Sequence, residues 1–363
     1  MTIEYRTGLG KEVADIYMRK NIPYAVQFEL TSRCNLKCRH CYMDIEKDYS
    51  SELSTEEVKG IIDQLVDIGT FYLGFTGGEI FTRKDLFEIA EYAKKKGFFI
   101  TFMTNGTLIG PELMEKIEKL RPIKFEISLY GATPKTHDYI TKVEGSFEST
   151  IAAIKGLVQH GITVTTKTSL MNLNVHESGD IKALCERLGV ICKLTPGMTP
   201  LRDGSLDPLK YDLSFEDMDS YLSADNFSLT YLAERVEKDP KDRFKCKAGK
   251  AICAISSSGI VFPCVTMAMP VGDLRKKSLK EIWHTDPDDE LKRLRDITID
   301  DLPMCSRCDL AELCIRCPGV IYLETGDFTG ATQNTCKYAQ WRRHLKDTEG
   351  VTVMQSTGSE STF

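Results

Sequence analysis

The sequence predicts an α/β fold, a partial (β/α)6 barrel of the TIM type followed by a small Cys-rich domain. Six apolar runs typical of buried strands alternate with segments of helical apolar spacing between residues 25 and 195. Of the 13 cysteines, eight lie between Cys246 and Cys336. Six strand-helix units are too few to close an eight-unit barrel, so we expect an open barrel with its chemistry at the carboxyl ends of the strands.

The predicted barrel spans residues 24–196. A lead-in of residues 1–23, with a short helix around 12–18, is too short to form a domain of its own. Ser54 and Glu57 have the spacing of a capping box at the start of a helix. The six strands are expected at residues 25–30, 72–76, 98–103, 123–129, 162–170 and 190–195.

The composition changes after the barrel. Residues 197–243 begin with a stretch rich in Pro, Gly and Asp, which predicts a linker or cover loop, and continue with a helical pattern over 214–236. Residues 244–345 are expected to form the Cys-rich domain. The Ser/Thr-rich tail at 346–363 has little to bury and is expected to be disordered.

Composition also limits the partners and the location. The 363 residues are 42% hydrophobic, but no apolar run reaches the roughly 18 residues of a membrane helix, and the N-terminus lacks the apolar centre of a signal peptide. We therefore expect a cytoplasmic protein without a membrane partner. A net charge of -6 gives no basic surface for nucleic acid. Cytosolic thiols stay reduced, so the cysteines indicate metal sites rather than disulfides.

Three cysteines, Cys34, Cys38 and Cys41, directly follow the first predicted strand. A [4Fe-4S] cluster normally takes four thiolates, so three on one loop would leave one iron open to a substrate. Three Cys with His40 could also form a structural zinc site. Because His40 is adjacent to Cys41 and neighbouring residues rarely both reach one tetrahedral ion, the spacing favours the cluster.

This Cys-x3-Cys-x2-Cys spacing resembles the signature of the radical S-adenosylmethionine (SAM) enzymes, in which the open iron takes the amino and carboxyl groups of SAM. The second strand ends in Gly77, Gly78 and Glu79, which match the Gly-Gly-Glu motif that holds the SAM amino group in that family. Glycines let the backbone approach a ligand closely, and a carboxylate accepts hydrogen bonds from an ammonium group. Ile80 stands where the family usually has proline.

Further SAM contacts are implied at the strand ends. Thr104 and Asn105 follow the third strand and Ser128 ends the fourth, where similar proteins face SAM, although Asn105 before a glycine is also ordinary turn chemistry. Tyr42 is expected near the adenine or in the core. Lys167 on the fifth strand is a candidate for the SAM carboxylate, but the alternation does not say which face is inside. His137 and Asp138 are expected to be structural or to line the barrel mouth.

The C-terminal cysteines resemble those of the SPASM domain, which binds two auxiliary [4Fe-4S] clusters. The resemblance assigns Cys246, Cys253, Cys264 and Cys317 to auxiliary cluster I, and Cys305, Cys308, Cys314 and Cys336 to auxiliary cluster II. The expected cofactors are thus three [4Fe-4S] clusters and SAM. The central group consists of Cys305, Cys308, Cys314 and Cys317. Between its last two cysteines the family usually has three residues, and this chain has two. Two zinc ribbons are the alternative, and the remaining thiols, Cys185 and Cys192, are expected to be buried small hydrophobes.

The resemblance implies reductive cleavage of SAM to methionine and a 5′-deoxyadenosyl radical, which takes hydrogen from an unactivated carbon inside a barrel that shields it from water. Auxiliary clusters would accept an electron from the substrate radical. SPASM enzymes act mostly on peptides and proteins, so we expect an anaerobic oxidoreductase that makes a thioether, C–C or C–O crosslink in a ribosomally synthesised peptide. Val265 stands where sulfatase-maturing relatives carry an acidic base, which disfavours formylglycine formation.

The implied partners are a peptide or protein substrate and an electron donor such as flavodoxin or ferredoxin. Because few residues precede the first strand, either a separate leader-binding protein presents the substrate or leader recognition is built differently. One alternative is an enzyme that oxidatively decarboxylates a tetrapyrrole in haem synthesis. A non-catalytic iron-sulfur or zinc protein is another, but it would need neither the turn at 77–79 nor a barrel of this size.

Overall fold

The barrel strands and the helices between them lie where the sequence alternation predicts them. The structure, a computed structural model, describes residues 11–43, 49–221 and 246–349. The six barrel strands are β1 (Ala25–Thr31), β2 (Tyr72–Gly77), β3 (Phe99–Thr104), β4 (Lys124–Ser128), β5 (Val164–Leu170) and β6 (Ile191–Pro196), all within two residues of their expected ends. The helices are α1 (Lys11–Arg19), α2 (Thr55–Asp67), α3 (Leu86–Lys95), α4 (Pro111–Leu120), α5 (Pro134–Thr141), α6 (Ser146–Gln159) and α7 (Ser178–Leu188). The capping box at Ser54 and Glu57 is present at the start of α2.

The second half of the chain is more irregular. Its elements are α8 (Phe215–Tyr221), β7 (Ile252–Ile255), β8 (Ile260–Phe262), β9 (Gly272–Asp273), α10 (Asp289–Asp296), α11 (Pro318–Thr325) and α12 (Gln333–Glu349), with a π-helical turn at Glu281–Thr285. Short 3-10 turns occur at Ile80–Thr82, Val175–Glu177, Asp207–Tyr211, Ile299–Asp301 and Ala311–Leu313. The helix expected over 214–236 begins as α8, and its remainder lies outside the described residues. The expected tail starts later than residue 345, because α12 runs to Glu349; residues beyond 349 are not described.

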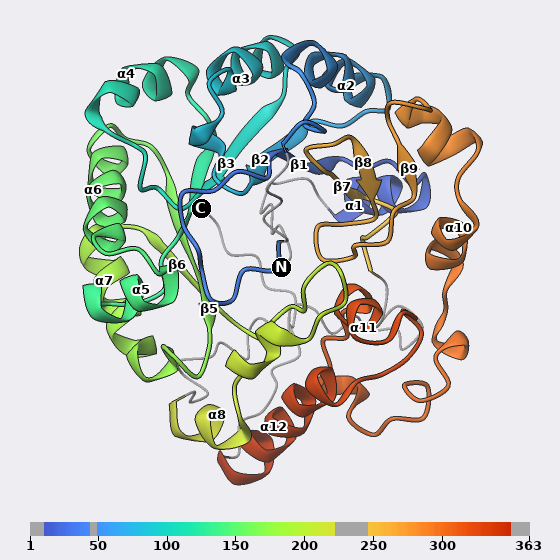
Figure 1. Ribbon diagram of the computed structural model, residues 1–363. Coiled ribbons are helices and arrows are strands. Elements are labelled where there is room, and N and C mark those ends of the chain that lie inside the picture. The colour runs from blue at the N-terminus through green and yellow to red at the C-terminus, as the bar shows by residue number, and fades with distance from the viewer. Residues whose placement is uncertain (1–10, 44–48, 222–245, 350–363) are drawn as a thin grey trace.

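One nine-stranded sheet connects the two halves, in the order β6-β5-β4-β3-β2-β1-β7-β8-β9 (Figure 1). The six barrel strands are parallel, and β7 adds to the free edge of β1, also in parallel, with Val26 opposite Cys253. Strands β8 and β9 then pair antiparallel. The Cys-rich part, expected as a separate domain, therefore extends the barrel sheet.

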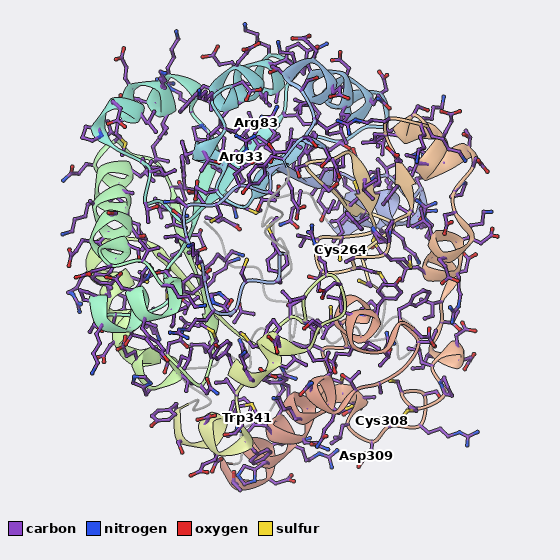
Figure 2. All side chains as sticks on the ribbon, in the orientation of Figure 1. Arg33, Arg83, Cys264, Cys308, Asp309 and Trp341 are labelled. Carbon is purple, nitrogen blue, oxygen red and sulfur yellow. The ribbon has the colours of Figure 1, made fainter. Side chains whose placement is uncertain are left out.

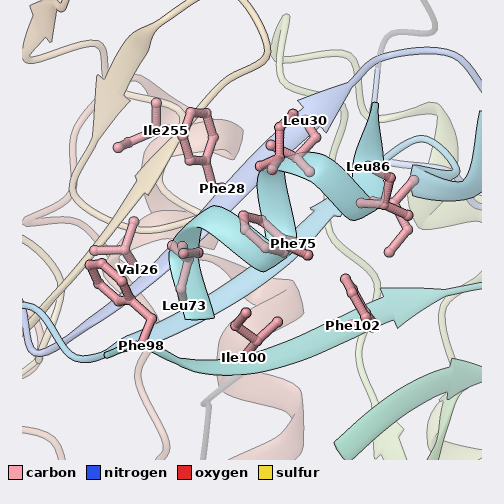
Figure 3. Packing of buried hydrophobic residues seen from close by; sticks show 14 of the residues in the cluster. Val26, Phe28, Leu30, Leu73, Phe75, Leu86, Phe98, Ile100, Phe102 and Ile255 are labelled. Carbon is pink, nitrogen blue, oxygen red and sulfur yellow. The ribbon is translucent and has the colours of Figure 1, made fainter. Parts of the chain in front are cut away.

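The convex face of this sheet carries the main hydrophobic core, under the helices on the outside of Figure 1. Successive residues of a strand point to opposite faces, so alternate positions of β1, β2 and β3 share this core. Figure 3 shows the packing of Val26, Phe28, Leu30, Leu73, Phe75, Ile100, Phe102 and Ile255. Burying each such side chain stabilises the fold by roughly 1.5–3 kcal/mol. Because Ile255 of β7 belongs to the same core, the core also continues between the two halves.

The concave face of the sheet is polar where the convex face is apolar. The intervening positions of β1 carry Gln27 and Glu29, and that of β4 carries Glu126, each at most 5% exposed. The Gln27 amide donates to the Met103 sulfur of β3 at 3.4 Å. The chain thus places hydrogen-bonding and charged groups inside the open barrel. No helix within the described ranges is long and apolar enough to span a bilayer.

Candidate active site

The loop after β1 carries Cys34, Cys38 and Cys41 and is tied to the end of α5. The Lys37 N–H donates to Thr141 O at 3.1 Å, and the Arg39 N–H donates to Ile140 O at 2.9 Å. These bonds fix the loop at the carboxyl end of the first strand, where the sequence predicts it.

The three thiols of this loop are half-buried and lie close enough to repel one another as thiolates. Burial raises the pKa of Cys34 to about 11, and Glu79 and Cys41 add to the shift. Burial, followed by the charges of Cys41 and Cys34, raises the pKa of Cys38 further. Thiolates at this place therefore need a positive group to neutralise them. A bound iron-sulfur cluster meets that need because it coordinates thiolates, and the donor set fits it.

The thiols are not arranged for a single metal ion. Among residues 11–43, 49–221 and 246–349, no three His, Cys, Asp or Glu side chains are grouped so that they could hold one ion. A zinc ion would draw its sulfur ligands close together, because each Zn–S bond is about 2.3 Å long. A polynuclear cluster holds its thiolates on separate iron atoms and therefore spreads them further apart.

Gly77 and Gly78 allow the end of β2 to cross the beginning of the cysteine loop. The Gly78 N–H donates to Thr31 O at 2.8 Å and the Glu79 N–H to Arg33 O at 2.7 Å. A Cβ atom on Gly77, whose φ is +135°, would lie 2.2 Å from Thr31 O, and one on Gly78 would lie 2.2 Å from Arg33 O. The glycines were expected to admit a ligand; in the structure the group that approaches them is the backbone of the cysteine loop.

Glu79 organises the neighbouring strand ends. Its side chain is 0% exposed and accepts hydrogen bonds from Thr104 Oγ1 (2.7 Å), the Asn105 N–H (2.8 Å) and the Phe81 N–H (3.1 Å). Burial raises its pKa, and these donors oppose the shift. Asn105 Nδ2 donates in turn to Asn35 Oδ1 of the cysteine loop at 2.9 Å. Glu79, Thr104 and Asn105 are thus joined to the cysteine loop in one hydrogen-bonded unit.

Ser128 and Lys167 are opposite each other on β4 and β5. Thr166, the neighbour of Lys167, contacts Cys185 of α7 on the convex face, so Lys167 lies on the concave face. This settles the question that the alternation left open. The Lys167 ammonium is 3.3 Å from Glu126 Oε2, and Lys124 Nζ is 2.6 Å from Glu126 Oε1. Lys167 is therefore inside the barrel but already paired with a carboxylate.

Tyr130 was not singled out by the sequence, yet it connects Ser128 with the cysteine loop. Its hydroxyl shares a hydrogen bond with Ser128, and burial, then the charge of Cys38, raises its pKa. Its ring packs edge-on against His40 at 4.4 Å. The His40 Nδ1 is buried and has no hydrogen-bond partner among the described residues, and burial lowers the pKa of His40 to about 4. Both rings thus line the loop as neutral groups.

The pair at residues 137 and 138 is structural. His137 Nδ1 accepts a hydrogen bond from the Tyr130 N–H at 3.1 Å. The Asp138 carboxylate accepts from the Gly145 N–H, Ser146 Oγ and the Phe147 N–H, each at 2.8 Å. Asp138 therefore satisfies free donors at the start of α6, and His137 positions the backbone beside Tyr130.

Arg202 and Glu29 form an ion pair that sequence reasoning also missed. Arg202 lies in residues 197–214, which we call the cover loop, and its guanidinium binds both oxygens of Glu29, with Nη1 2.8 Å from Oε2. Tyr42, expected near SAM or in the core, is half-buried, and the guanidinium carbon lies 5.7 Å from the centre of its ring. The available signal for Glu29 was a charged residue within a predicted buried strand. An arginine in an irregular loop gives no such signal.

The four cysteines assigned to auxiliary cluster II come together. Burial raises the pKa of Cys314 to about 11, and its charged neighbours include Cys336, Cys305 and Cys308. Cys308 is exposed and lies beside Asp309 near the rim in Figure 2. Cys336 belongs to α12, so this helix is attached to the predicted cluster site.

Only three of the four cysteines assigned to auxiliary cluster I come together. Burial raises the pKa of Cys264 to about 12, and Cys246 and Cys317 add to the shift. In Figure 2, Cys264 lies nearer the centre of the molecule than Cys308 does. Cys253 is 2% exposed in the main core, and its charged neighbour is Arg295. The pairing of Cys253 with Val26 on β1 directs its side chain to the convex, apolar face, away from the other three thiols. Its assignment as a ligand stays a prediction.

The two remaining cysteines lie next to each other at the convex face. Cys185 of α7 is buried, and its thiol shares a hydrogen bond with that of Cys192 of β6. Thr166 Oγ1 is 3.1 Å from the Cys185 sulfur. Both thiols lie apart from the three sets described above.

Comparison with known families agrees with this arrangement. Residues 28–188 match the Radical SAM superfamily, and residues 246–309 match SPASM, an iron-sulfur cluster-binding domain. The first range contains Cys34, Cys38 and Cys41, and the second contains Cys246, Cys253, Cys264, Cys305 and Cys308.

Individual relatives cover most of the chain. An AdoMet-dependent heme synthase of Methanosarcina barkeri is 28% identical over 345 residues, which are 85% of this chain and 95% of the relative. The mycofactocin maturase MftC of Mycobacterium tuberculosis is 30% identical over 255 residues, 67% of this chain and 64% of the relative. The crystal structure of Streptococcus suis SuiB bound to its precursor peptide SuiA has the same fold, with a TM-score of 0.69 at 16% identity, over 90% of this chain and 79% of SuiB.

Proposed function

Because this chain belongs to the radical SAM superfamily and carries a SPASM iron-sulfur cluster-binding domain, we propose that it cleaves SAM reductively and uses the resulting radical to crosslink a peptide oxidatively. One observation carries the first part of the proposal. The loop of Cys34, Cys38 and Cys41 shares one hydrogen-bonded unit with Glu79 and Asn105, so the thiols that would hold a cluster lie beside the groups that would hold SAM.

The residues of this unit have separate roles in the proposal. Cys34, Cys38 and Cys41 hold a [4Fe-4S] cluster, which supplies the electron that cleaves SAM. The Glu79 carboxylate takes the SAM amino group: its Oε2 accepts one bond, from the Asn105 N–H, and keeps a lone pair for a second donor. Gly77 and Gly78 hold the turn that presents Glu79. Asn105, Thr104, Ser128, Tyr42 and Lys167 are the further candidates for SAM contacts.

The auxiliary thiols are the reason for proposing an oxidative reaction. Cys305, Cys308, Cys314 and Cys336 hold one cluster, and Cys246, Cys264 and Cys317 hold another, for which the described residues bring together three thiols rather than four. These sets provide a place for the electron that a substrate radical gives up. A crosslink, which removes two hydrogens from the substrate, follows naturally from such an arrangement.

The concave face of the barrel supports a peptide as substrate. Among the described residues, two cations at this face are already paired with carboxylates, Arg202 with Glu29 and Lys167 with Glu126. A peptide can exchange hydrogen bonds with such a polar wall. A tetrapyrrole offers a flat apolar face and several carboxylates, which would need apolar walls and free cations. The similarity to a mycofactocin maturase over two thirds of the chain also favours a maturase.

A tetrapyrrole enzyme is the second candidate. The observation in its favour is the similarity to an AdoMet-dependent heme synthase, which extends over 85% of this chain and 95% of the relative. Oxidative decarboxylation of a propionate side chain uses the same radical and the same electron acceptor, so the two candidates differ only in the substrate that enters the barrel.

Anaerobic purification tests the radical reaction. We expect brown protein with about twelve iron atoms per chain if three four-iron clusters are bound, and release of 5′-deoxyadenosine from SAM that depends on dithionite. Changing Cys34, Cys38 and Cys41 together to Ala should abolish the release. Cys185→Ala is the matched control, because this thiol lies in the convex core away from the three sets, and it should leave the release unchanged. Protein that binds zinc and no iron would refute the proposal.

Two substrates offered in parallel distinguish the candidates. Synthetic precursor peptides, encoded by short reading frames next to the gene, should lose two hydrogens, as mass spectrometry measures. A porphyrin with propionate side chains should remain unchanged. If instead the porphyrin loses a carboxyl group and the peptides stay intact, the tetrapyrrole candidate replaces the peptide one.

A further inference from the structure

The Arg202–Glu29 pair joins the cover loop to the concave face of the barrel. Both oxygens of Glu29 receive a guanidinium nitrogen, a two-point contact that fixes the plane and direction of the arginine. Glu29 is 2% exposed and Arg202 is 19% exposed. A pair so removed from water interacts far more strongly than the same pair at the surface.

The guanidinium of this pair lies between the radical site and the auxiliary site. It is 5.7 Å from the ring centre of Tyr42, which directly follows Cys41, and 5.5 Å from that of Phe262, which precedes Cys264 by two positions on the chain. Aromatic faces attract a cation, so both rings add to its placement.

The backbone around Arg202 is fixed as well. The Leu201 N–H donates to Ser205 O at 3.0 Å and the Gly204 N–H to Leu201 O at 3.0 Å, which closes a tight turn. Further along the cover loop, Asp212 accepts hydrogen bonds from Tyr338 Oη at 2.6 Å and the Met198 N–H at 3.2 Å. Since Tyr338 lies in α12, the loop is anchored at both of its ends.

The charge of Arg202 acts on Cys41. Burial raises the pKa of this thiol, and the Met43 N–H and the Arg202 charge oppose the rise. Arg202 Nε is buried and has no hydrogen-bond partner within the described ranges, although a buried donor without a partner costs about 1–3 kcal/mol. The guanidinium thus acts on Cys41 through its charge and keeps one buried donor without a partner among the described residues.

We infer that Arg202 is a positioning residue of the radical site: it fixes a positive charge beside Cys41, and Glu29 limits that charge, so that together they set how readily a cluster on Cys34, Cys38 and Cys41 accepts an electron. This inference rests on the proposed function, because it requires a cluster at these three thiols. It goes beyond that function because it assigns a role to the cover loop and to Glu29.

The sign of each effect follows from electrostatics. One-electron reduction adds negative charge to the cluster, and a fixed positive charge favours that state. Arg202→Gln therefore makes the reduction potential more negative. Glu29→Gln removes the opposing negative charge and makes the potential more positive. Arg202→Lys keeps the charge but loses the two-point contact, so its potential stays closest to that of the native protein.

A potentiometric titration with dithionite, followed by electron paramagnetic resonance without SAM, tests the inference. The relevant signal is the one that disappears when Cys34, Cys38 and Cys41 are changed to Ala. Arg293→Gln is the matched control: this arginine also lies over an aromatic ring, Phe328 at 4.7 Å, and beside carboxylates, but at a half-exposed surface position. It should not move the potential of this signal.

Opposite shifts for Arg202→Gln and Glu29→Gln support the inference, because a purely structural disturbance would move both in one direction. Shifts of the same sign, no shift, or an equal shift in Arg293→Gln overturn it. Arg202→Gln leaves Glu29 buried and unpaired, and this variant could therefore fail to fold. In that case Glu29→Gln alone decides: if it does not make the reduction potential more positive, the inference is overturned. If the Cys to Ala protein retains every signal, the proposed function itself fails.

Discussion

Gly78 lies so close to Arg33 that a Cβ atom added to it would sit 2.2 Å from the Arg33 carbonyl oxygen. The contact is part of the crossing of β2 over the cysteine loop, together with the hydrogen bond from the Glu79 N–H to the same oxygen at 2.7 Å. The position of the three thiols therefore depends on a glycine that directly follows β2, at a place where any side chain would collide with the loop.

Gly78→Ala should push the cysteine loop away from β2. We expect the free energy of unfolding to fall by about 3 kcal/mol and the iron content to drop, as chemical denaturation and iron analysis measure. Gly60→Ala is the control, since nothing lies within 4 Å of the added Cβ in the middle of α2; it should stabilise the protein by about 0.5–1 kcal/mol. Equal effects of the two changes would contradict the close crossing.

Glu79→Gln tests the site assigned to the SAM amino group. Glutamine has a similar shape, but it has no charge and carries an NH2 group, with two N–H donors, in place of one accepting oxygen. Loss of a charge-assisted bond should weaken SAM binding by about tenfold, as anaerobic calorimetry on the iron-loaded protein measures. Glu88→Gln, a change at an exposed carboxylate that pairs with Lys59, should leave the affinity unchanged. Native affinity in Glu79→Gln would exclude Glu79 as a ligand of SAM.

Cys253 and Cys264 are expected to respond differently to substitution by Ala. Cys264 lies with Cys246 and Cys317, whereas Cys253 points into the convex core. Cys264→Ala should therefore lose about one four-iron cluster per chain, and Cys253→Ala should retain its iron and lose only a little stability. Iron and sulfide analysis of the anaerobically purified variants measures both. Iron loss in Cys253→Ala would restore the four-thiol set that the spacing suggests.

His137 should make the stability of the fold depend on pH. Burial lowers its pKa to about 4, against 6.5 in the unfolded chain. The folded state therefore binds fewer protons, and the free energy of unfolding, which is at its full value above pH 6.5, falls as the pH drops towards 4. The shift corresponds to roughly 3 kcal/mol. His137→Gln keeps an acceptor for the Tyr130 N–H and should remove this part of the dependence, in denaturant melts between pH 4 and 7. The pKa of His40 is also lowered to about 4, so His40 should preserve part of the pH dependence of stability in the His137→Gln variant.

Sequence reasoning predicts the barrel well because both of its signals are local. Strand and helix periodicity gives the six strands, and motif spacing gives the loop of Cys34 and the turn at Glu79, which the structure joins through short hydrogen bonds. The alternation around Lys167 is ambiguous, since its neighbours on both faces are threonines, so only packing against α7 shows which face is inside.

The features that the sequence does not predict depend on long-range pairing. Strand β7 has four residues, too few for a clear period, and its place beside β1 fixes the direction in which Cys253 points. Spacing alone suggests a ligand there. Arg202 lies in a loop without periodicity, and its partner Glu29 is far away in the sequence. Such contacts are decided by tertiary packing, which leaves no local pattern.

The pairing of β1 with β7 also has a consequence for biosynthesis. Residues 25–28 leave the ribosome early, but the edge of β1 finds its partner only when residues 252–255 have been made. During that interval a nearly complete barrel presents open backbone donors and acceptors, which favour pairing with other chains. Newly made chains should therefore depend on chaperones until the Cys-rich part emerges, and chains that end before residue 252 should aggregate even though they contain all six barrel strands.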